Sequence, residues 1–226
     1  MTRKPLERKR AKNLPALAEE VEEPCLLKYT RQFLHGQIHP DDARPHCDIP
    51  LTKYPHYEGK VSVFHSAAAT FYAPSDSSGI GGMRREHIRA TPSWCNGPPR
   101  YDCIFVNTAS DLEGMRGLDI ARVRCFFSFA FRGILYPCAL VHWFERIGND
   151  PDEGTGMWRV EPQVDDHGSR YTSVIHVDTI LRAAHLIPVY GHDFIPREIK
   201  FYHSYDLFRA YYVNKFADHH AFTIAY

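Results

Sequence analysis

Aromatic side chains are the residues of this sequence whose type could build a ligand site. In small β-barrel readers, about two to four aromatic rings at the barrel mouth hold a methylated lysine through cation–π attraction, often beside one acid. The candidates here are Tyr101, Trp143, Trp158 and Tyr190, with Glu145 as the acid. The alternative is that these rings fill the hydrophobic core, the commoner role of such side chains.

Arginine side chains form a second candidate site, one for nucleic acid. Arg84, Arg85 and Arg89 follow the glycine-rich segment 79–82, and Arg122 and Arg124 lie on an expected strand. Guanidinium groups contact the phosphate backbone, and such binding weakens steeply as salt is raised. The glycine-rich segment lacks the Gly-Lys-Ser/Thr ending of a P-loop, so we interpret it as a surface loop that enters a short helix.

Positive charge is concentrated at the start of the chain, although the whole sequence has 27 basic and 27 acidic residues. Residues 1–12 hold six basic side chains against Glu7 alone. Such a segment favours contact with nucleic acid or recognition as a nuclear address, and the alternative is a solvated, disordered tail. We expect a nuclear location.

Acidic residues and histidines do not predict a metal site. A transposase of the DDE type needs three carboxylates and two metal ions on a sheet that alternates with helices. Acids occur at Asp102, Asp119, Glu145 and Asp178, but residues 100–180 predict hairpins instead. Cys138 and His142 share one face of a strand, yet zinc would need two further ligands beside them. We expect no metal and no cofactor.

The six cysteines predict buried thiols and no catalytic nucleophile. None forms a C-x-x-C pair, and Cys103, Cys125 and Cys138 lie inside apolar segments, where the thiolate is disfavoured. This usage indicates a reducing compartment. No catalytic residue is predicted, and we expect the protein not to be an enzyme.

The remaining composition is that of a globular protein of 226 residues with 44% hydrophobic side chains. No apolar run approaches the roughly 18–20 residues that a transmembrane helix needs. The basic start has no apolar core, so it does not predict a secretory signal.

Short segments rich in Val, Ile, Phe, Tyr, Trp and Thr predict strands joined by turns. They are residues 61–72, 101–106, 119–131, 134–144, 157–161 and 173–178. Arg132-Gly133 predicts a tight hairpin between two of them. Alternation puts Ala121, Val123, Cys125, Phe127 and Phe129 on one face, with Arg122, Arg124 and Ser128 on the other. Segment 134–144 is apolar on both faces, which predicts a central strand covered on both sides or a strand with one face that forms a groove.

Four regions follow from these patterns. We expect a basic, disordered tail over 1–23, a helix and proline-rich wrap over 24–59, a β-barrel domain over 60–195 and a helical extension over 196–226. Within them, residues 24–36 and 178–187 predict helical segments. Phe208, Tyr211, Tyr212 and Phe216 have the spacing of a C-terminal helix that begins near Ser204.

Several segments occur together in a familiar order. They are HSAAATFYAPSDSSGIGGMRREHIRATPSW, ARVRCFFSFAFRGILYPCALVHWF, GMWRVEP, VIHVDTILRAAHLIPVYG and FRAYYVNKFADHHAF. In this order they resemble the C-terminal region of transposon-derived proteins of mushroom-forming fungi, of the Plavaka and Kyakuja–Dileera–Zisupton kind. The resemblance covers about residues 30–226 and implies an accessory region behind a transposase, to which it attaches no particular activity.

A second resemblance is to the strand pattern of bromo-adjacent homology (BAH) domains. Asp102, Ala121-Arg122-Val123, Trp143–Arg146 and Asp178 with Ile180 occupy comparable places. The sequence departs from the pattern at Ala183-Ala184-His185, which replace a glycine and a cysteine, and after Arg146, where R-P-E-E-T is absent. The resemblance implies a fold only.

We therefore expect a mainly β protein, a small SH3/BAH-like β-barrel with an N-terminal helix and a C-terminal helix. Its expected function is that of a non-enzymatic interaction domain of a fungal mobile element. The expected partner is a chromatin protein or another transposon-encoded protein. The alternative is a nucleic-acid-binding tail of a transposase fragment, in which case the partner is DNA.

Overall fold

The computed structural model describes residues 10–42, 44–45, 48–74, 80–191 and 194–226. The strands are β1 (Val61–Phe64), β2 (Ser66–Tyr72), β3 (Met83–Thr91), β4 (Arg100–Tyr101), β5 (Cys103–Asn107), β6 (Leu118–Phe131), β7 (Ile134–Arg146), β8 (Arg159–Pro162), β9 (Thr172–His176), β10 (Ile180–Ala184), β11 (Leu186–Pro188) and β12 (Tyr211–Val213). The α-helices are α1 (Leu14–Glu20), α2 (Leu26–Ile38), α3 (Ser204–Leu207) and α4 (His219–Ile224).

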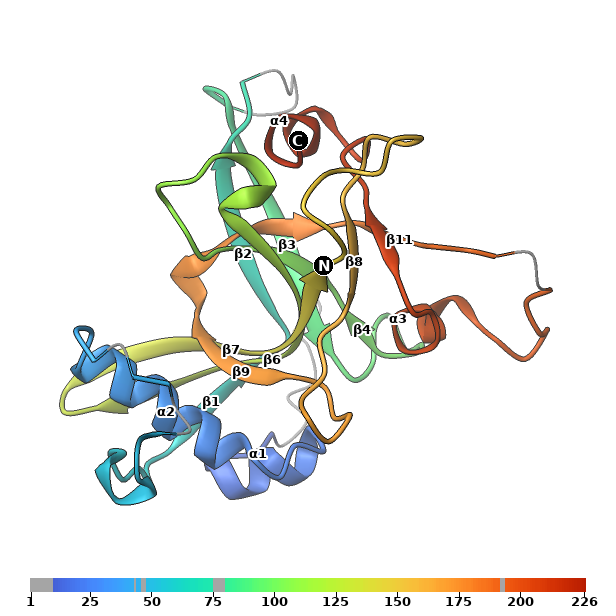
Figure 1. Ribbon diagram of the computed structural model, residues 1–226. Helices are drawn as coiled ribbons and strands as arrows, with labels where there is room; N and C mark the ends of the chain where they lie inside the picture. The colour runs from blue at the N-terminus through green and yellow to red at the C-terminus, as the bar shows by residue number, and fades with distance from the viewer. Residues whose placement is uncertain (1–9, 43, 46–47, 75–79, 192–193) are drawn as a thin grey trace.

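The strands build a nearly closed antiparallel barrel of seven strands, which confirms the predicted mainly β fold. The larger sheet has the order β10-β5-β6-β7-β8-β12-β11, with β1 added to β6 and β9 to β7. The smaller sheet, β2-β3-β4, lies across from it (Figure 1). Between them, small and branched side chains from β2, β3, β5, β6, β7, β9 and β10 fill the interior, among them Ile88, Ile104 and Val141.

The hairpin of β6 and β7 is the longest pairing in the barrel, and it confirms the sequence prediction. Phe131 pairs with Ile134 across a two-residue turn. Arg132 and Gly133 have φ of 51° and 81°, as such a turn requires. β7 is covered on both faces, as predicted, because Ala139 and Val141 face the barrel interior while Cys138 and Leu140 pack on the opposite side.

A β-bulge in β6 overturns one predicted face. The pairing register shifts between Val123 and Cys125, so Arg124 is an extra residue in the ladder. Ala121 and Val123 consequently point into the barrel, as does Phe126 after the bulge, whereas Cys125, Phe127 and Phe129 pack outside. A uniform period of two cannot represent this shift, so the prediction of one common face for residues 121–129 was wrong.

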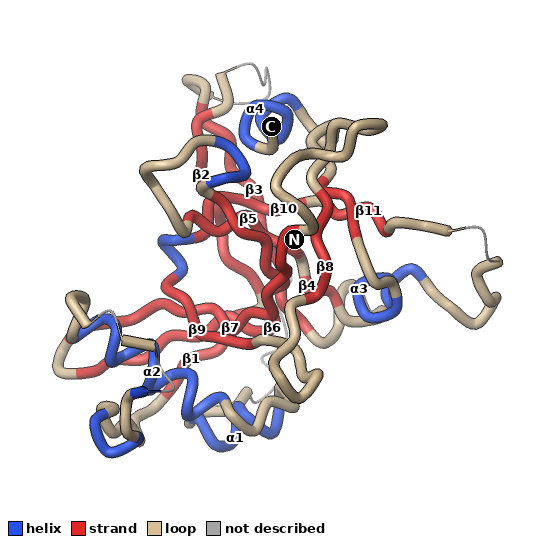
Figure 2. Tube along the Cα trace, in the orientation of Figure 1, coloured by secondary structure: helices blue, strands red, loops and turns tan. Residues whose placement is uncertain are grey.

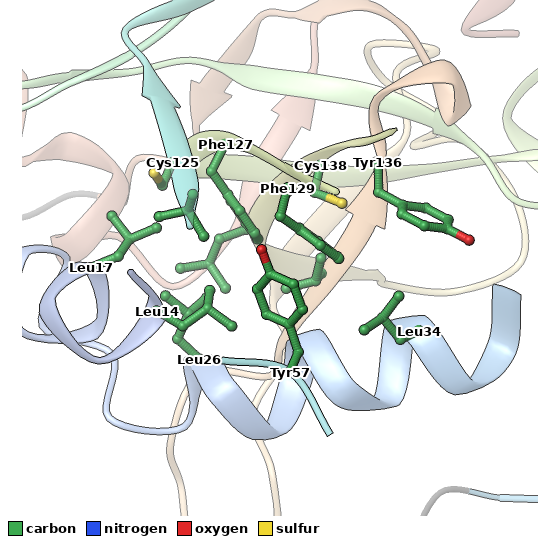
Figure 3. Close-up of a cluster of buried hydrophobic side chains, with 13 residues drawn as sticks. Leu14, Leu17, Leu26, Leu34, Tyr57, Cys125, Phe127, Phe129, Tyr136 and Cys138 are labelled. Atoms are coloured by element: carbon green, nitrogen blue, oxygen red, sulfur yellow. The ribbon is translucent and has the colours of Figure 1, made fainter. Parts of the chain in front are cut away.

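Two helices cover the outer face of the β6–β7 hairpin (Figure 1). Figure 3 shows Leu14, Leu17, Leu26 and Leu34 directed toward Phe127, Phe129 and Tyr136 of the sheet. α1 lies in the segment that we expected to be a disordered tail. Its Asn13 side chain accepts a hydrogen bond from the Ala16 amide at 2.9 Å and caps the helix, while Leu14 and Leu17 are buried. The basic residues 1–9 lie outside the described part of the chain.

The C-terminal region differs from the single predicted helix. After the short α3, the chain extends into β12, where Tyr211 and Val213 are fully buried in the cluster of Phe144. Only then does it form α4, and Figure 2 shows α3 and α4 as two separate short helices. Pairing with β8 and β11 supplies the hydrogen bonds that favour a strand over the helix.

Two further segments form strands where we expected helix. Residues 178–187 contribute the end of a 3₁₀ turn, then β10 and β11, because Ala183 and Ala184 pair with β5. Arg84, Arg85 and Arg89 lie on β3, whose alternation puts Ile88 and Ala90 in the core. Ile88 and Ala90, two positions apart, support this strand, although the preceding glycines masked the pattern.

Candidate functional site

A groove on the surface of the barrel brings arginine and aromatic side chains together. It lies between β4, β6, the loop before β4 and the segment that leads into α3, and has a volume of about 450 Å³. We call it the arginine–aromatic groove. Its lining includes Trp94, Arg100, Tyr101, Arg122, Phe201, Tyr202 and Tyr205.

The loop that carries Trp94 is shaped by its own sequence. The Trp94 amide donates to the Pro98 carbonyl oxygen at 3.1 Å, and the Gly97 amide donates to the Trp94 carbonyl oxygen at 2.8 Å. Cys95 and Asn96 have φ of 51° and 61°, a left-handed pair that reverses the chain within this short loop. The reversal sets the indole beside β3 and β4.

Guanidinium groups stack on the rings of this groove. Arg89 lies 3.8 Å from the centre of the Trp94 ring, and Arg100 lies 5.5 Å from the same ring. Arg124 lies 4.5 Å from the Tyr101 ring. A guanidinium held by its flat face keeps its N–H edge available for acceptor groups, which is the usual basis of phosphate recognition by arginine.

Arg122 joins two rings of the groove at its inner end. It lies 5.7 Å from the Tyr101 ring and 5.2 Å from the Tyr205 ring. Burial raises the pKa of Tyr205 well above its usual range, so that ring remains neutral and presents an apolar face.

Asp102 fixes the backbone and one guanidinium at the groove. Its carboxylate accepts the Arg89 amide at 2.9 Å, and its own amide donates to the Arg89 carbonyl oxygen at 2.9 Å. Arg100 Nε donates to the same carboxylate at 2.8 Å. Asp102 is thereby occupied with structural hydrogen bonds and a salt bridge.

The groove carries a surplus of positive charge. Asp102, which lines the groove, is already paired with Arg100, and the nearby Asp206 is paired with Arg122. Arg89 and Arg124 form no ion pair with any residue in the described ranges. A half-buried surface with unpaired guanidinium groups favours an anionic ligand and disfavours a cationic one.

The five candidates for an aromatic cage do not enclose one cleft. Tyr101 lies in the arginine–aromatic groove, whereas Trp143 packs at the edge of the barrel core and donates through Nε1 to Ser173 Oγ at 2.7 Å. Trp158 is 3% exposed within the cluster around Phe144. Glu145 is exposed opposite Glu161, and Tyr190 is exposed against Phe208. For Trp158, the alternative of a core role holds.

The five candidate arginines are only partly brought together. Arg89, Arg122 and Arg124 meet around the groove. Arg84 and Arg85 are neighbours on β3 and therefore point to opposite faces of the strand. Arg84 lies on the side of β3 that faces away from the groove, and its charge there helps to lower the pKa of Asp218.

Sequence reasoning missed Trp94, Arg100, Phe201, Tyr202 and Tyr205. The turn sequence Trp94–Arg100 carried a local signal, because the indole, two prolines and an arginine stand together. The segment 201–205 gave no such signal, since only the fold brings it beside β4 and β6, about 100 residues earlier in the chain.

Two features of the described residues bear on metal binding and on thiol chemistry. Within them, no three His, Cys, Asp or Glu side chains are grouped so that they could hold a metal ion. Burial raises the pKa of Cys103 and of Cys125 to about 12, which keeps both thiols protonated. In the described part of the chain, no helix combines the length and apolar character needed to span a membrane.

Comparison with known proteins gives one result. No protein-family model, curated protein or solved structure matches this chain. The groove must therefore be interpreted from its own chemistry.

Proposed function

We propose that this protein is a non-enzymatic interaction domain that binds single-stranded nucleic acid along the arginine–aromatic groove. The observation that supports this proposal is the stacking of Arg89 on Trp94 and of Arg124 on Tyr101, with neither guanidinium in an ion pair among the described residues. Proteins that bind single strands combine positive charge along the backbone with rings and guanidinium planes that stack on bases.

The exposed aromatic side chains at the groove strengthen the case for a single strand. Phe201 is 82% exposed, and its ring lies edge-to-face with that of Tyr202. Such rings can stack on unpaired bases, whereas bases in a duplex are already stacked on one another.

The chromatin-reader hypothesis remains a second proposal, with a different location for its ligand. A methylated lysine beside Tyr101 would meet the positive charges of Arg122 and Arg124, which repel it. A cage would therefore have to form near Trp143 and Glu145, away from the arginine–aromatic groove. The link to a fungal mobile element and a nuclear location belong to the same proposal and rest on the sequence resemblance and the basic start.

Fluorescence anisotropy with a labelled oligothymidine of about 12 nucleotides tests the main proposal. We expect binding whose logarithmic affinity falls linearly with the logarithm of salt concentration, by about 0.7 for each phosphate contacted. Tyr101→Ala should weaken binding roughly tenfold, since stacking contributes about 1–3 kcal/mol per base. Trp143→Ala should leave it unchanged.

Three outcomes would contradict the proposal. One is the absence of oligothymidine binding by the folded wild-type protein. Another is an affinity that does not depend on salt. The third is loss of binding in Trp143→Ala together with full binding in Tyr101→Ala, which would point to the Trp143 side of the barrel. Methylated and unmodified histone peptides, added to the same proteins, test the second proposal directly.

A further inference from the structure

Three arginines lie at or beside the inner end of the arginine–aromatic groove, between the two hydrophobic clusters on the outer face of β6, and Arg122 lines the groove itself. Arg122 and Arg124 come from β6, on either side of Val123, and the bulge keeps both on the outer side. Arg170 lies two residues before β9 and lines a neighbouring cavity together with Trp143 and Tyr171. Its Nη2 donates to the carbonyl oxygen of Tyr205, a residue of the groove, at 3.2 Å. We call these three residues the arginine triad.

The carboxylates of the described residues do not balance the three positive charges of the triad. Among the described residues, Asp206 is the only carboxylate in an ion pair with a member of the triad, at 2.7 Å from Arg122, and the Asp206 side chain is 59% exposed. Burial lowers the pKa of Arg170; Tyr211 and Asp206 oppose this shift, and the charges of Arg122 and Arg124 add to it. Like charges held together in a half-buried place destabilise one another unless an anion balances them.

One member of the triad has an unsatisfied donor. The Arg122 side chain is 7% exposed, and its Nε has no hydrogen-bond partner among the described residues. A buried guanidinium N–H without an acceptor costs free energy, so its persistence indicates that an acceptor belongs there.

A half-buried histidine lies beside the triad and is kept neutral there. His142 stands directly opposite Arg122 in the ladder of β6 and β7. Burial and the charges of the triad lower its pKa to about 3, and the charge of Asp206 opposes them only weakly. His142 is thus a neutral imidazole beside the triad, able to donate one hydrogen bond to an anion.

We propose that the arginine triad holds one phosphate group of the ligand, as a desolvated anchor at the inner end of the groove. This inference deepens the proposed function and, for nucleic acid as the source of the phosphate, rests on it. Arg122, Arg124 and Arg170 donate N–H groups to the phosphate oxygens, and Tyr101 and Tyr205 hold two of the guanidinium planes from behind. The same chemistry would accept free inorganic phosphate.

The test uses two probes on the whole chain. The first is inorganic pyrophosphate, followed through the arginine Nε–Hε signals in nuclear magnetic resonance spectra. The second is the labelled oligothymidine described above. The variants are Arg124→Gln and Arg170→Gln. A third variant, Arg170→Lys, keeps the positive charge but lacks the planar guanidinium group. Arg132→Gln at the tip of the β6–β7 hairpin is the matched control, since Arg132 is exposed there.

We expect pyrophosphate to shift the Arg122, Arg124 and Arg170 signals and leave Arg132 unshifted. Arg124→Gln and Arg170→Gln should each lower oligothymidine affinity about tenfold and reduce the salt slope by about 0.7, the loss of one phosphate contact. Arg170→Lys should recover part of the affinity. Chemical denaturation confirms that each variant is folded, and a variant that does not fold is replaced by its lysine counterpart.

The outcomes separate this inference from the proposed function. If oligothymidine binds the wild type and both glutamine variants with equal affinity and slope, the triad inference is wrong and the proposed function stands. If pyrophosphate shifts the triad but oligothymidine does not bind, the triad is a phosphate site and the proposed function is wrong. Shifts spread equally over Arg132 and the triad would overturn the inference.

Discussion

Arg182 on β10 and Asp218, which caps the C-terminal helix, are joined by two parallel hydrogen bonds of 2.8 and 2.6 Å. The Arg182 side chain is 5% exposed, and its guanidinium also lies 4.6 Å from the Phe71 ring of β2. Asp218 accepts the Ala221 amide at 2.8 Å as well. This pair therefore fastens α4 to the barrel.

Breaking this pair should destabilise the protein. Asp218→Ala removes the helix cap and leaves Arg182 with Glu86 at 3.5 Å as its remaining anion, so we expect a loss of about 3 kcal/mol in the free energy of unfolding. Urea denaturation measures it. Arg44→Ala, at an ion pair whose arginine is 60% exposed, is the control and should change the unfolding midpoint little. Equal effects of the two substitutions would show that the pair does not fasten α4.

His142 should make the stability of the protein fall on acidification. Its pKa is about 3 in the folded protein, whereas the ordinary value is 6.5, so the unfolded chain binds the proton more tightly between these values. Stability is therefore fully present above pH 6.5 and falls by about 1.4 kcal/mol per pH unit below it, until about pH 3.

The variant His142→Gln isolates this contribution. Urea denaturation at several pH values should give a shallower loss for the variant than for the wild type, with the difference growing from pH 6.5 to pH 4. Parallel stability curves for the two proteins would mean that the imidazole is solvated and titrates normally.

Leu17 should stabilise the whole domain, although it lies in a segment that the sequence predicts to be disordered. Its side chain is fully buried between α1 and the outer face of the sheet (Figure 3). Leu17→Ala should cost about 2–4 kcal/mol, because a buried leucine leaves a cavity when it is truncated. Leu51→Ala, at a leucine that is 63% exposed, is the control. If both variants unfold at the wild-type urea concentration, α1 does not contribute to the fold.

The β6–β7 hairpin and the barrel class were determined by the sequence itself. Arg132-Gly133 can adopt the left-handed conformation that a two-residue turn needs, and the flanking residues alternate or are apolar throughout. These are local properties, so they can be predicted without knowing which strands pair with each other. The N-terminal helix over Leu26–Ile38 was predictable for the same reason, to within two residues at either end.

Tertiary pairing decided the elements that sequence reasoning misassigned. Tyr211 has the spacing of a helical residue, yet it becomes part of β12 because β8 and β11 offer hydrogen-bond partners. The bulge at Arg124 is invisible in a binary pattern, since one extra residue changes the face of everything that follows.

The candidate site was predictable in part from the sequence, and in part only from the tertiary structure. The residue types of the site, arginine and aromatic, were evident from the sequence, and Tyr101, Arg89, Arg122 and Arg124 were named from it. Which of them meet was decided only by the fold, because Tyr205 approaches Arg122 across 83 positions of the chain. Long-range packing also placed Trp158 in the core and left Trp94 at the groove. The two tryptophans differ in their burial, which the sequence does not show.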